Sequence, residues 1–292
     1  MTSSQTDVTE KYWPAPAKLN LFLHVLGRRA DGYHELQTLF QLLDWGDELL
    51  FTVNDNGEIS RSSDNRSIPH DFPEREDLCI RAAQLLQNLC RVSQGAHIEL
   101  RKNIPIGAGL GGGSSDAATV LIALNHLWDC GLSRRQLAAA GLELGADVPV
   151  FVQGCSAWAQ GRGEKLQPVS LGEKYYVLVF PSFGVSTAEV FQYPGLKRDS
   201  RPLAVTETNL QPGNNDCQAA ALELYPQLAE IMQDLQAWGD PRVSGTGSTI
   251  FLTFADKKSA INTARKLKCR YNVRAVGGVD RSPLMDRLSA GE

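Results

Sequence analysis

The 292-residue sequence lacks the signals that direct a chain into or across a membrane. No apolar run approaches the ~20 residues that a membrane-spanning helix needs. Residues 1–16 have no basic segment followed by an apolar one, as a secretory signal would, and they lack the arginines of a transit peptide. We therefore expect a soluble cytoplasmic protein with no membrane partner, and a frayed tail over the polar residues 2–10.

Paired cysteines and an excess of positive charge are missing as well. The six cysteines are scattered and include no C-x-x-C pair, so no zinc or dithiol site of that kind is indicated. We interpret them as buried thiols in a reducing compartment. The 29 Lys and Arg residues stand against 33 Asp and Glu residues, and the net charge of −4 gives no global positive field to hold nucleic acid. We expect no nucleic-acid partner, although the net charge does not exclude a local basic patch.

Hydrophobic residues make up 42% of the chain, which is enough for one large core or for two at ~100–200 residues per domain. Alternating or continuous apolar stretches predict strands at residues 18–26, 48–53, 58–61, 96–100, 148–152, 155–159, 175–180, 249–254 and 271–276. Helical spacing predicts helices at residues 77–92, 114–128, 133–144, 216–224, 226–238 and 257–267. The polar stretch 194–215 predicts a long loop, and a domain boundary is expected between residues ~160 and ~180.

A glycine-rich segment, P-I-G-A-G-L-G-G-G-S-S at residues 105–115, joins a predicted strand to a predicted helix. Its five glycines allow positive φ angles and close backbone approach to a ligand. The helix behind it, with Ser114 or Ser115 as its cap, adds free amides and the positive end of its dipole. The segment therefore predicts a phosphate-binding loop, with a flexible loop that binds nothing as the alternative.

Other nucleotide-binding motifs fit this segment less well. Gly107, Gly109 and Gly112 satisfy G-x-G-x-x-G, but the preceding Pro105 and a long helix past Trp128 do not match a dinucleotide fold. No Walker A lysine follows the glycines. The sequence also has no H-R-D or D-F-G motif, which excludes the protein kinases.

Asp147 lies among apolar residues in the segment L-G-A-D-V-P. A carboxylate there is partly desolvated unless it is paired, and Lys18, at the start of the first predicted strand, is the natural partner. Such a pair suits phosphoryl transfer to an alcohol, which needs the alcohol's proton removed. A structural ion pair or a turn aspartate is the alternative. Tyr33 and His34 present an aromatic face and a histidine after a predicted turn, although such a dipeptide is commonly packing or surface.

Five segments, in this order along the chain, resemble the GHMP kinase superfamily: P-A-P-A-K-L-N (14–20), R-A-D-G-Y-H (29–34), the glycine-rich loop, G-A-D-V-P (145–149) and S-G-T-G-S (244–248). The resemblance runs from about Pro14 to Arg281 and so covers nearly the whole chain. Galactokinase, homoserine kinase and mevalonate kinase share the loop and the late S-G-T-G but lack these versions of the first three segments. The sequence is most similar to the branch that acts on a cytidine-diphosphate sugar alcohol.

The resemblance implies a two-domain α/β (α+β) fold. Residues 12–165 would form a half like domain 2 of ribosomal protein S5, and residues 166–286 a ferredoxin-like half. It implies transfer of the γ-phosphoryl group of ATP, accompanied by Mg²⁺, to the 2-hydroxyl of 4-diphosphocytidyl-2-C-methyl-D-erythritol in the non-mevalonate isoprenoid pathway. The alternatives are a kinase for another small alcohol, of the homoserine, galactose or mevalonate type, or a catalytically silent homologue that binds a small ligand or nucleic acid.

The resemblance also implies roles for single residues. Asp147 would be the general base, and Lys18 would hold it ionised and orient the hydroxyl. Asn20 would bind the methylerythritol portion, Tyr33 and Phe191 would stack on cytosine, His34 would bind its edge, and Thr187 would lie nearby. The residues implied at ATP are Lys102, Pro105, Ile106, Gly107, Ala108, Gly109, Leu110, Gly111, Gly112, Gly113, Ser114, Ser115, Gly245, Thr246 and Gly247. Asp77 stands where the family commonly has an asparagine, and Ala108 where a glycine is common.

Overall fold

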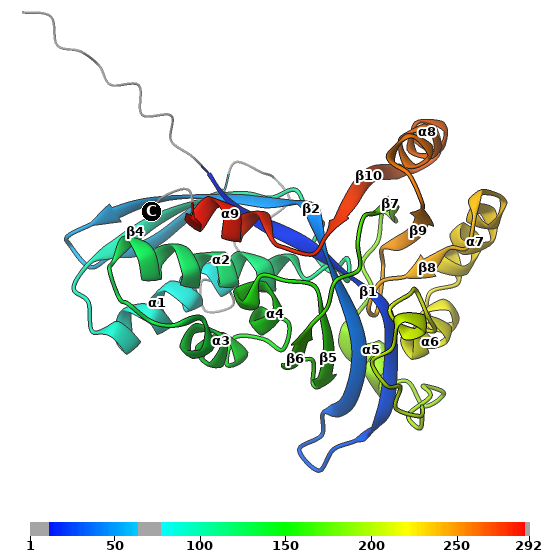
Figure 1. Cartoon of the computed structure of the whole chain (residues 1–292), viewed down its shortest axis with the longest axis horizontal. Coiled ribbons are helices and arrows are strands. Elements are labelled where there is room, and N and C mark those ends of the chain that lie inside the picture. Colours follow the sequence, from blue (N-terminus) through cyan, green and yellow to red (C-terminus); the bar gives the residue numbers. More distant parts are fainter. Residues whose placement is uncertain (1–11, 64–76, 290–292) are drawn as a thin grey trace, which may run out of the picture.

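The computed structural model describes residues 12–63 and 77–289, so the tail expected at residues 2–10 lies outside the described residues. Within these ranges a single ten-stranded sheet runs through both halves of the chain. Its strand order is β3-β4-β2-β10-β7-β9-β8, while β1 and β5 also pair with β2, and β6 pairs with β5. The two halves are therefore joined by strand pairing as well as by the chain (Figure 1).

A long antiparallel hairpin organises the first half. It consists of β1 (Trp13–Arg28) and β2 (His34–Asn54), joined by the turn that contains Asp31 and Gly32. The predicted strands at residues 18–26 and 48–53 cover the middle of β1 and the end of β2, and the first part of β2, which is buried without interruption from Gln37 to Leu43, was not predicted. A strand buried on both faces shows no period of two. The hairpin is flanked by β3 (Ile59–Ser63), β4 (Gly95–Arg101), β5 (Ala157–Gly161) and β6 (Lys165–Pro168).

Four helices pack together on the first half, as Figure 1 shows: α1 (Leu78–Cys90), α2 (Gly112–Leu127), α3 (Arg134–Leu142) and α4 (Val148–Gln153). The strand predicted at residues 148–152 is wrong, because these residues form α4. The run V-P-V-F-V is buried throughout, so its periodicity cannot separate strand from helix, whereas Pro149 in the first turn favours a helix start. No helix of residues 12–63 and 77–289 combines the length and the apolar character needed to span a membrane.

The start of α2 also differs from the prediction. Gly111 is the N-cap, with a positive φ of 72°, and α2 begins at Gly112. Ser115 lies inside the helix and is fully buried, and its hydroxyl donates to the Pro16 carbonyl at 2.7 Å. The serines therefore do not cap the helix as expected, because the glycines themselves turn the chain into it.

The second half contains the predicted strands and helices in the predicted order, together with three short elements, at residues 187–192, 242–243 and 283–289, that were not predicted. Its described elements surround the antiparallel strands β7, β9 and β10. The predicted loop at 194–215 is confirmed, with only the single-turn helix Glu207–Asn209 inside it. The elements are β7 (Lys174–Phe180), α5 (Thr187–Gln192), α6 (Asp216–Leu224), α7 (Pro226–Leu235), β8 (Arg242–Val243), β9 (Ile250–Phe254), α8 (Lys257–Leu267), β10 (Asn272–Val279) and α9 (Pro283–Ser289).

The end of the chain returns to the first half. The last residues of β10 pair with Leu42 and Leu43 of β2. Leu284 and Met285 of α9 are then buried in the core that α1, α2 and α4 form. A second core lies among α5–α8, and a third, which includes Trp158 and Tyr176, connects the two. The fold is thus the mixed helix-and-sheet architecture that the sequence predicts, with the chain's last helix closing the first core.

The cysteines differ in burial. Cys79 and Cys217 are buried, as expected, and none of the six forms a disulfide. Cys269 is exposed, and Cys90, Cys130 and Cys155 are half-buried, so the expectation of six buried thiols is wrong for these four.

Candidate active site

A cleft of about 560 Å³ is lined by side chains from both halves of the chain. It gathers residues of β1, the glycine-rich loop, the α4 N-terminus, α5 and the turn at residues 244–248. The predicted site residues that line it are Lys18, Asn20, Lys102, Pro105, Ile106, Gly107, Ala108, Gly109, Leu110, Gly111, Gly112, Gly113, Ser114, Asp147, Thr187, Phe191, Gly245 and Thr246. Tyr33, His34, Ser115 and Gly247 are not part of its lining.

The glycine-rich loop packs directly on the S-G-T-G turn. Gly109 has a φ of +73°, and a Cβ added there would lie 2.3 Å from the carbonyl oxygen of Ser244, so only glycine fits. The Ser244 hydroxyl donates to the Gly109 carbonyl at 3.1 Å. On the other side, the backbone N–H of Lys18 donates to the Leu110 carbonyl at 3.0 Å. The loop is therefore held between the two halves, with the free amides of the α2 N-terminus at the cleft.

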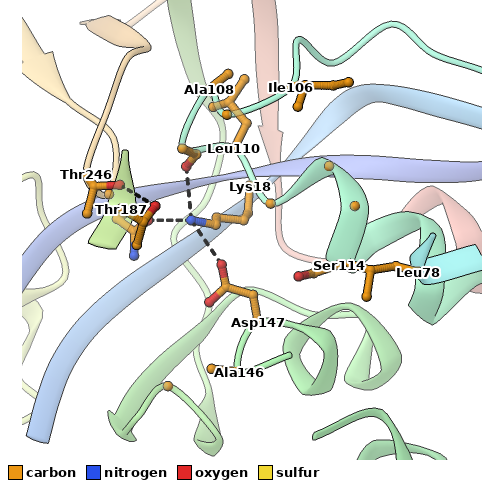
Figure 2. Close-up of a pocket in the computed structure, with 18 of the residues that line it drawn as sticks. Lys18, Leu78, Ile106, Ala108, Leu110, Ser114, Ala146, Asp147, Thr187 and Thr246 are labelled. Carbon is orange, nitrogen blue, oxygen red and sulfur yellow. Dashed lines mark hydrogen bonds and ion pairs between the residues drawn. The ribbon is translucent and has the colours of Figure 1, made fainter. Parts of the chain in front are cut away.

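Lys18 and Asp147 meet in this cleft, as Figure 2 shows. The Lys18 Nζ lies 3.4 Å from Asp147 Oδ2, and it donates to Asn20 Oδ1 at 2.6 Å and to the Gly109 carbonyl at 3.0 Å. Only 4% of the Lys18 side chain is exposed, against 32% of that of Asp147. The predicted pairing is present, with a fixed ammonium and a carboxylate that a ligand in the cleft can reach.

Lys102 belongs to a second cluster of charged side chains at the same cleft. No pattern in the sequence predicted this cluster. Its Nζ contacts Asp47 Oδ2 at 2.5 Å and Asp116 Oδ2 at 2.7 Å, and all three side chains are buried. Burial, opposed by Lys102 and reinforced by Asp47, raises the pKa of Asp116 to about 8. The two carboxylates outweigh burial and raise the pKa of Lys102. Lys102 thus lines the cleft as a fully engaged cation.

Asp77, the departure from the family pattern, has a structural explanation. It caps α1, where its Oδ1 accepts from the backbone N–H groups of Cys79 at 2.8 Å and Ile80 at 3.3 Å. Its other oxygen pairs with the Arg61 guanidinium. Asp77 therefore caps α1 and pairs with Arg61 while it also lines the cleft.

An aromatic group lies beside the cleft near α5. The His34 ring stacks on Phe191, with centroids 5.1 Å apart and planes at 25°. Arg198 Nε donates to His34 Nε2 at 3.2 Å, and its NH2 group donates to the Phe191 and Tyr193 carbonyls. Burial and the charges of Arg198 and Arg28 lower the pKa of His34, which favours a neutral ring with its proton on Nδ1. Sequence reasoning missed Arg198, because no motif links it to His34.

Tyr33 and Thr187 take separate positions around this group. Tyr33 is 57% exposed, and the Arg162 guanidinium lies 4.7 Å from its ring centroid. The Thr187 and Thr246 hydroxyls are 3.0 Å apart across the cleft lining (Figure 2). The structure thus brings Thr187 to the S-G-T-G turn and leaves Tyr33 at the outer edge.

Comparison with known proteins gives a consistent result over nearly the whole length. Residues 77–155 match the GHMP kinases N terminal domain, and residues 202–273 match the GHMP kinases C terminal domain. The 4-diphosphocytidyl-2-C-methyl-D-erythritol kinase of Nitrosococcus oceani is 48% identical over 276 residues, which cover 94% of this chain and 97% of that protein. The protein of the same name from Shewanella loihica is 46% identical over 289 residues, 99% of both chains.

Solved structures support the same fold. A crystal structure of 4-(cytidine 5'-diphospho)-2C-methyl-D-erythritol kinase, 35% identical, has a TM-score of 0.80 over 92% of this chain and 99% of that one. Homoserine kinase from Cytophaga hutchinsonii, only 16% identical, has a TM-score of 0.66 over 97% of this chain and 98% of its own, which shows a shared fold.

Proposed function

This chain belongs to the 4-diphosphocytidyl-2-C-methyl-D-erythritol kinase family of GHMP kinases, and we propose that it phosphorylates the 2-hydroxyl of that cytidyl substrate with ATP. It is a phosphotransferase, and the reaction would be a step of the non-mevalonate route to isoprenoid precursors. The placement of Lys18 and Asp147 beside the glycine-rich loop carries the proposal, because it puts a carboxylate where an alcohol would meet a bound triphosphate.

In the proposed reaction the substrate hydroxyl oxygen attacks the γ-phosphorus as the bond to the ADP oxygen breaks. Asp147 takes the hydroxyl proton, and its exposed fraction of 32% leaves it accessible to that group. Lys18 is anchored by Asn20 and Gly109, so its ammonium stays beside the reacting oxygens without reorganisation. The loop amides and the α2 N-terminus hold the ATP phosphates.

Magnesium fits this site as an ion that arrives with ATP. Protein-bound Mg²⁺ keeps several waters and takes one or two protein oxygens together with phosphate oxygens. The oxygens of Ser114 and Asp147 line the cleft, while no group of three or more His, Cys, Asp or Glu side chains in the described ranges forms a ready-made metal site. When bound, the ion would neutralise phosphate charge.

The aromatic group supports a cytidine subsite. Phe191 lines the cleft and has one face on His34, so we assign its cleft side to the cytosine ring, with Tyr33 on the opposite face of that base. The proton that Arg198 places on His34 Nδ1 can be donated to an acceptor on the cytosine edge. Asn20 and Thr187 then lie on the side of the reacting sugar alcohol.

The proposal is tested by ADP release with Mg²⁺-ATP and 4-diphosphocytidyl-2-C-methyl-D-erythritol, run beside galactose, homoserine and mevalonate. We expect turnover on the cytidyl substrate alone. Turnover on one of the other alcohols would assign a different kinase activity. ATP binding without turnover on any of them would instead indicate a catalytically silent homologue. The Tyr33→Ala and Phe191→Ala variants should weaken cytidyl-substrate binding by ~1–3 kcal/mol each if both rings stack on the base.

A further inference from the structure

Three cations line the cleft, and only one of them has no anionic partner among the residues that the structure describes. Lys18 pairs with Asp147, and Lys102 pairs with two carboxylates. The Arg162 guanidinium, by contrast, makes no ion pair and no hydrogen bond within residues 12–63 and 77–289, and it lies over the Tyr33 ring. Asp31 is close enough to Arg162 for the two charges to interact, but its carboxylate is already paired with Arg29 at 3.2 Å.

The position of Arg162 is set by a braced turn between β5 and β6. Its backbone N–H donates to Glu164 Oε2 at 2.6 Å, and the next N–H, of Gly163, donates to the Gln160 carbonyl at 3.2 Å. A Cβ added at Gly163 would lie 3.9 Å from Asp147 Oδ1. The backbone of this turn therefore lies beside the proposed base, while the Arg162 side chain reaches the ring of Tyr33, 4.7 Å away.

This placement matches the order of groups in the substrate that the proposed function assigns. A diphosphate links cytidine to methylerythritol, so it must lie between the aromatic residues and Asp147. Arg162 spans this interval, and a guanidinium presents paired N–H donors that match phosphate oxygens. Tyr33 has two faces, and Arg162 over one of them leaves the other for cytosine.

We propose that Arg162 binds the diphosphate of the cytidyl substrate and thereby makes the cleft selective for a nucleoside diphosphate over a nucleoside. This inference rests on the proposed function. Lys18 and Lys102 are engaged elsewhere, so the diphosphate has no other unpaired cation in the described lining of the cleft. Arg162 is thus a specificity-determining residue that does not take part in proton transfer.

The test is a calorimetric titration of the full chain with cytidine and with CDP, each in the presence of a saturating non-hydrolysable ATP analogue so that CDP cannot occupy the phosphate loop. The unmodified protein should bind CDP more tightly than cytidine. Arg162→Gln should weaken CDP binding roughly ten- to hundredfold, as expected for loss of a charge-assisted contact, and leave cytidine within about twofold. Arg162→Lys keeps the positive charge but loses the paired N–H donors of the guanidinium, so its affinity for CDP should lie between those of the unmodified protein and Arg162→Gln.

Lys165→Gln is the matched control, because it removes an exposed positive charge three residues away, on β6 and outside the cleft lining. It should change neither affinity. In turnover assays Arg162→Gln should raise KM for the cytidyl substrate and leave KM for ATP unchanged.

Several results would overturn the inference. If Arg162→Gln weakens cytidine binding and CDP binding equally, Arg162 acts only through Tyr33. If Lys165→Gln weakens CDP binding as much as Arg162→Gln does, the overall positive charge near the cleft is responsible rather than Arg162 itself. Unchanged CDP binding in Arg162→Gln would remove the role altogether. If the unmodified protein binds neither cytidine nor CDP, the proposed function itself fails, and that outcome is distinct from a failure of Arg162.

Discussion

Two clusters of lysine and aspartate border the same cleft, and they differ in how many partners the lysine has and how deeply the carboxylates are buried. Lys18 has one carboxylate, 3.4 Å away and about one-third exposed. Lys102 has two, at 2.5 and 2.7 Å, with exposed fractions of 0% for Asp47 and 4% for Asp116. A carboxylate that can meet a substrate is able to take a proton, whereas one buried against a shared ammonium is committed to the fold. Under the proposed function, the same residue types would serve chemistry in the first cluster and stability in the second.

The largest effect is expected from Asp147→Asn. The amide cannot take the hydroxyl proton, so kcat should fall by about 10²–10⁴. The ion pair that is lost is partly exposed, so the free energy of unfolding should change by less than ~1 kcal/mol. ADP-release kinetics and urea unfolding measure the two quantities. A variant that turns over at nearly the normal rate would remove the role of general base.

The reverse pattern is expected from Lys102→Met. It leaves the buried acidic side chains of Asp47 and Asp116 without their cation and should lower the free energy of unfolding by ~3–5 kcal/mol. The double variant Lys102→Met with Asp116→Leu removes one of these two buried acidic groups and should recover at least part of that loss. Urea unfolding of both variants provides the measurement. Equal stability of Lys102→Met and the unmodified protein would show that the second cluster is not structural.

The pH dependence of the free energy of unfolding gives a further test of the second cluster. The pKa of Asp116 in the folded protein, about 8, lies above its ordinary value of 3.8, so the folded state holds a proton that the unfolded chain releases. This group's contribution to stability is therefore complete at low pH, is lost between about pH 4 and pH 8, and changes no further above that, with a slope of at most ~1.4 kcal/mol per pH unit. Urea unfolding of Asp116→Asn across the same range should show a flatter dependence, and parallel curves would contradict the assignment.

The smallest effect is expected from Thr38→Val, which weakens the support of the first cluster. Thr38 Oγ1 accepts from Asn20 Nδ2 at 2.9 Å, and Asn20 Oδ1 in turn accepts from Lys18. Loss of this hydrogen bond should lower kcat roughly three- to tenfold without altering KM for ATP. Thr38→Ser keeps the hydroxyl and should restore the rate. If the serine variant is as slow as the valine variant, packing of the methyl group rather than the hydrogen bond positions Lys18.

Local patterns predicted most elements of the fold, including strands such as β1 and β7 that are buried on both faces. They missed the first part of β2 and assigned α4 as a strand, because a fully buried segment need not have a polar face by which strand and helix periods can be told apart. The cap of α2 was misplaced for a different reason, since Gly111 supplies a left-handed turn that needs no serine.

The site was predictable only in part. The glycine-rich loop, Lys18 and Asp147 lie in recognisable segments, and the structure brings them together as expected. The cluster of Lys102 and the contact of Arg198 with His34 join residues far apart in sequence, with nothing in their local sequence to link them. Such pairings depend on how the sheet aligns its strands, and neither composition nor spacing encodes that alignment directly.

The return of β10 and α9 to the first half has a consequence for synthesis on the ribosome. Leu284 and Met285 complete the core of the first half, and the Val279 carbonyl accepts from the Gln41 side chain at 3.0 Å. The amino-terminal half therefore emerges from the exit tunnel long before the residues that close it are made. Until the segment that contains α9 has been made and has left the tunnel, a nascent chain carries an unfilled position in its first core, so the amino-terminal half cannot complete its packing before then.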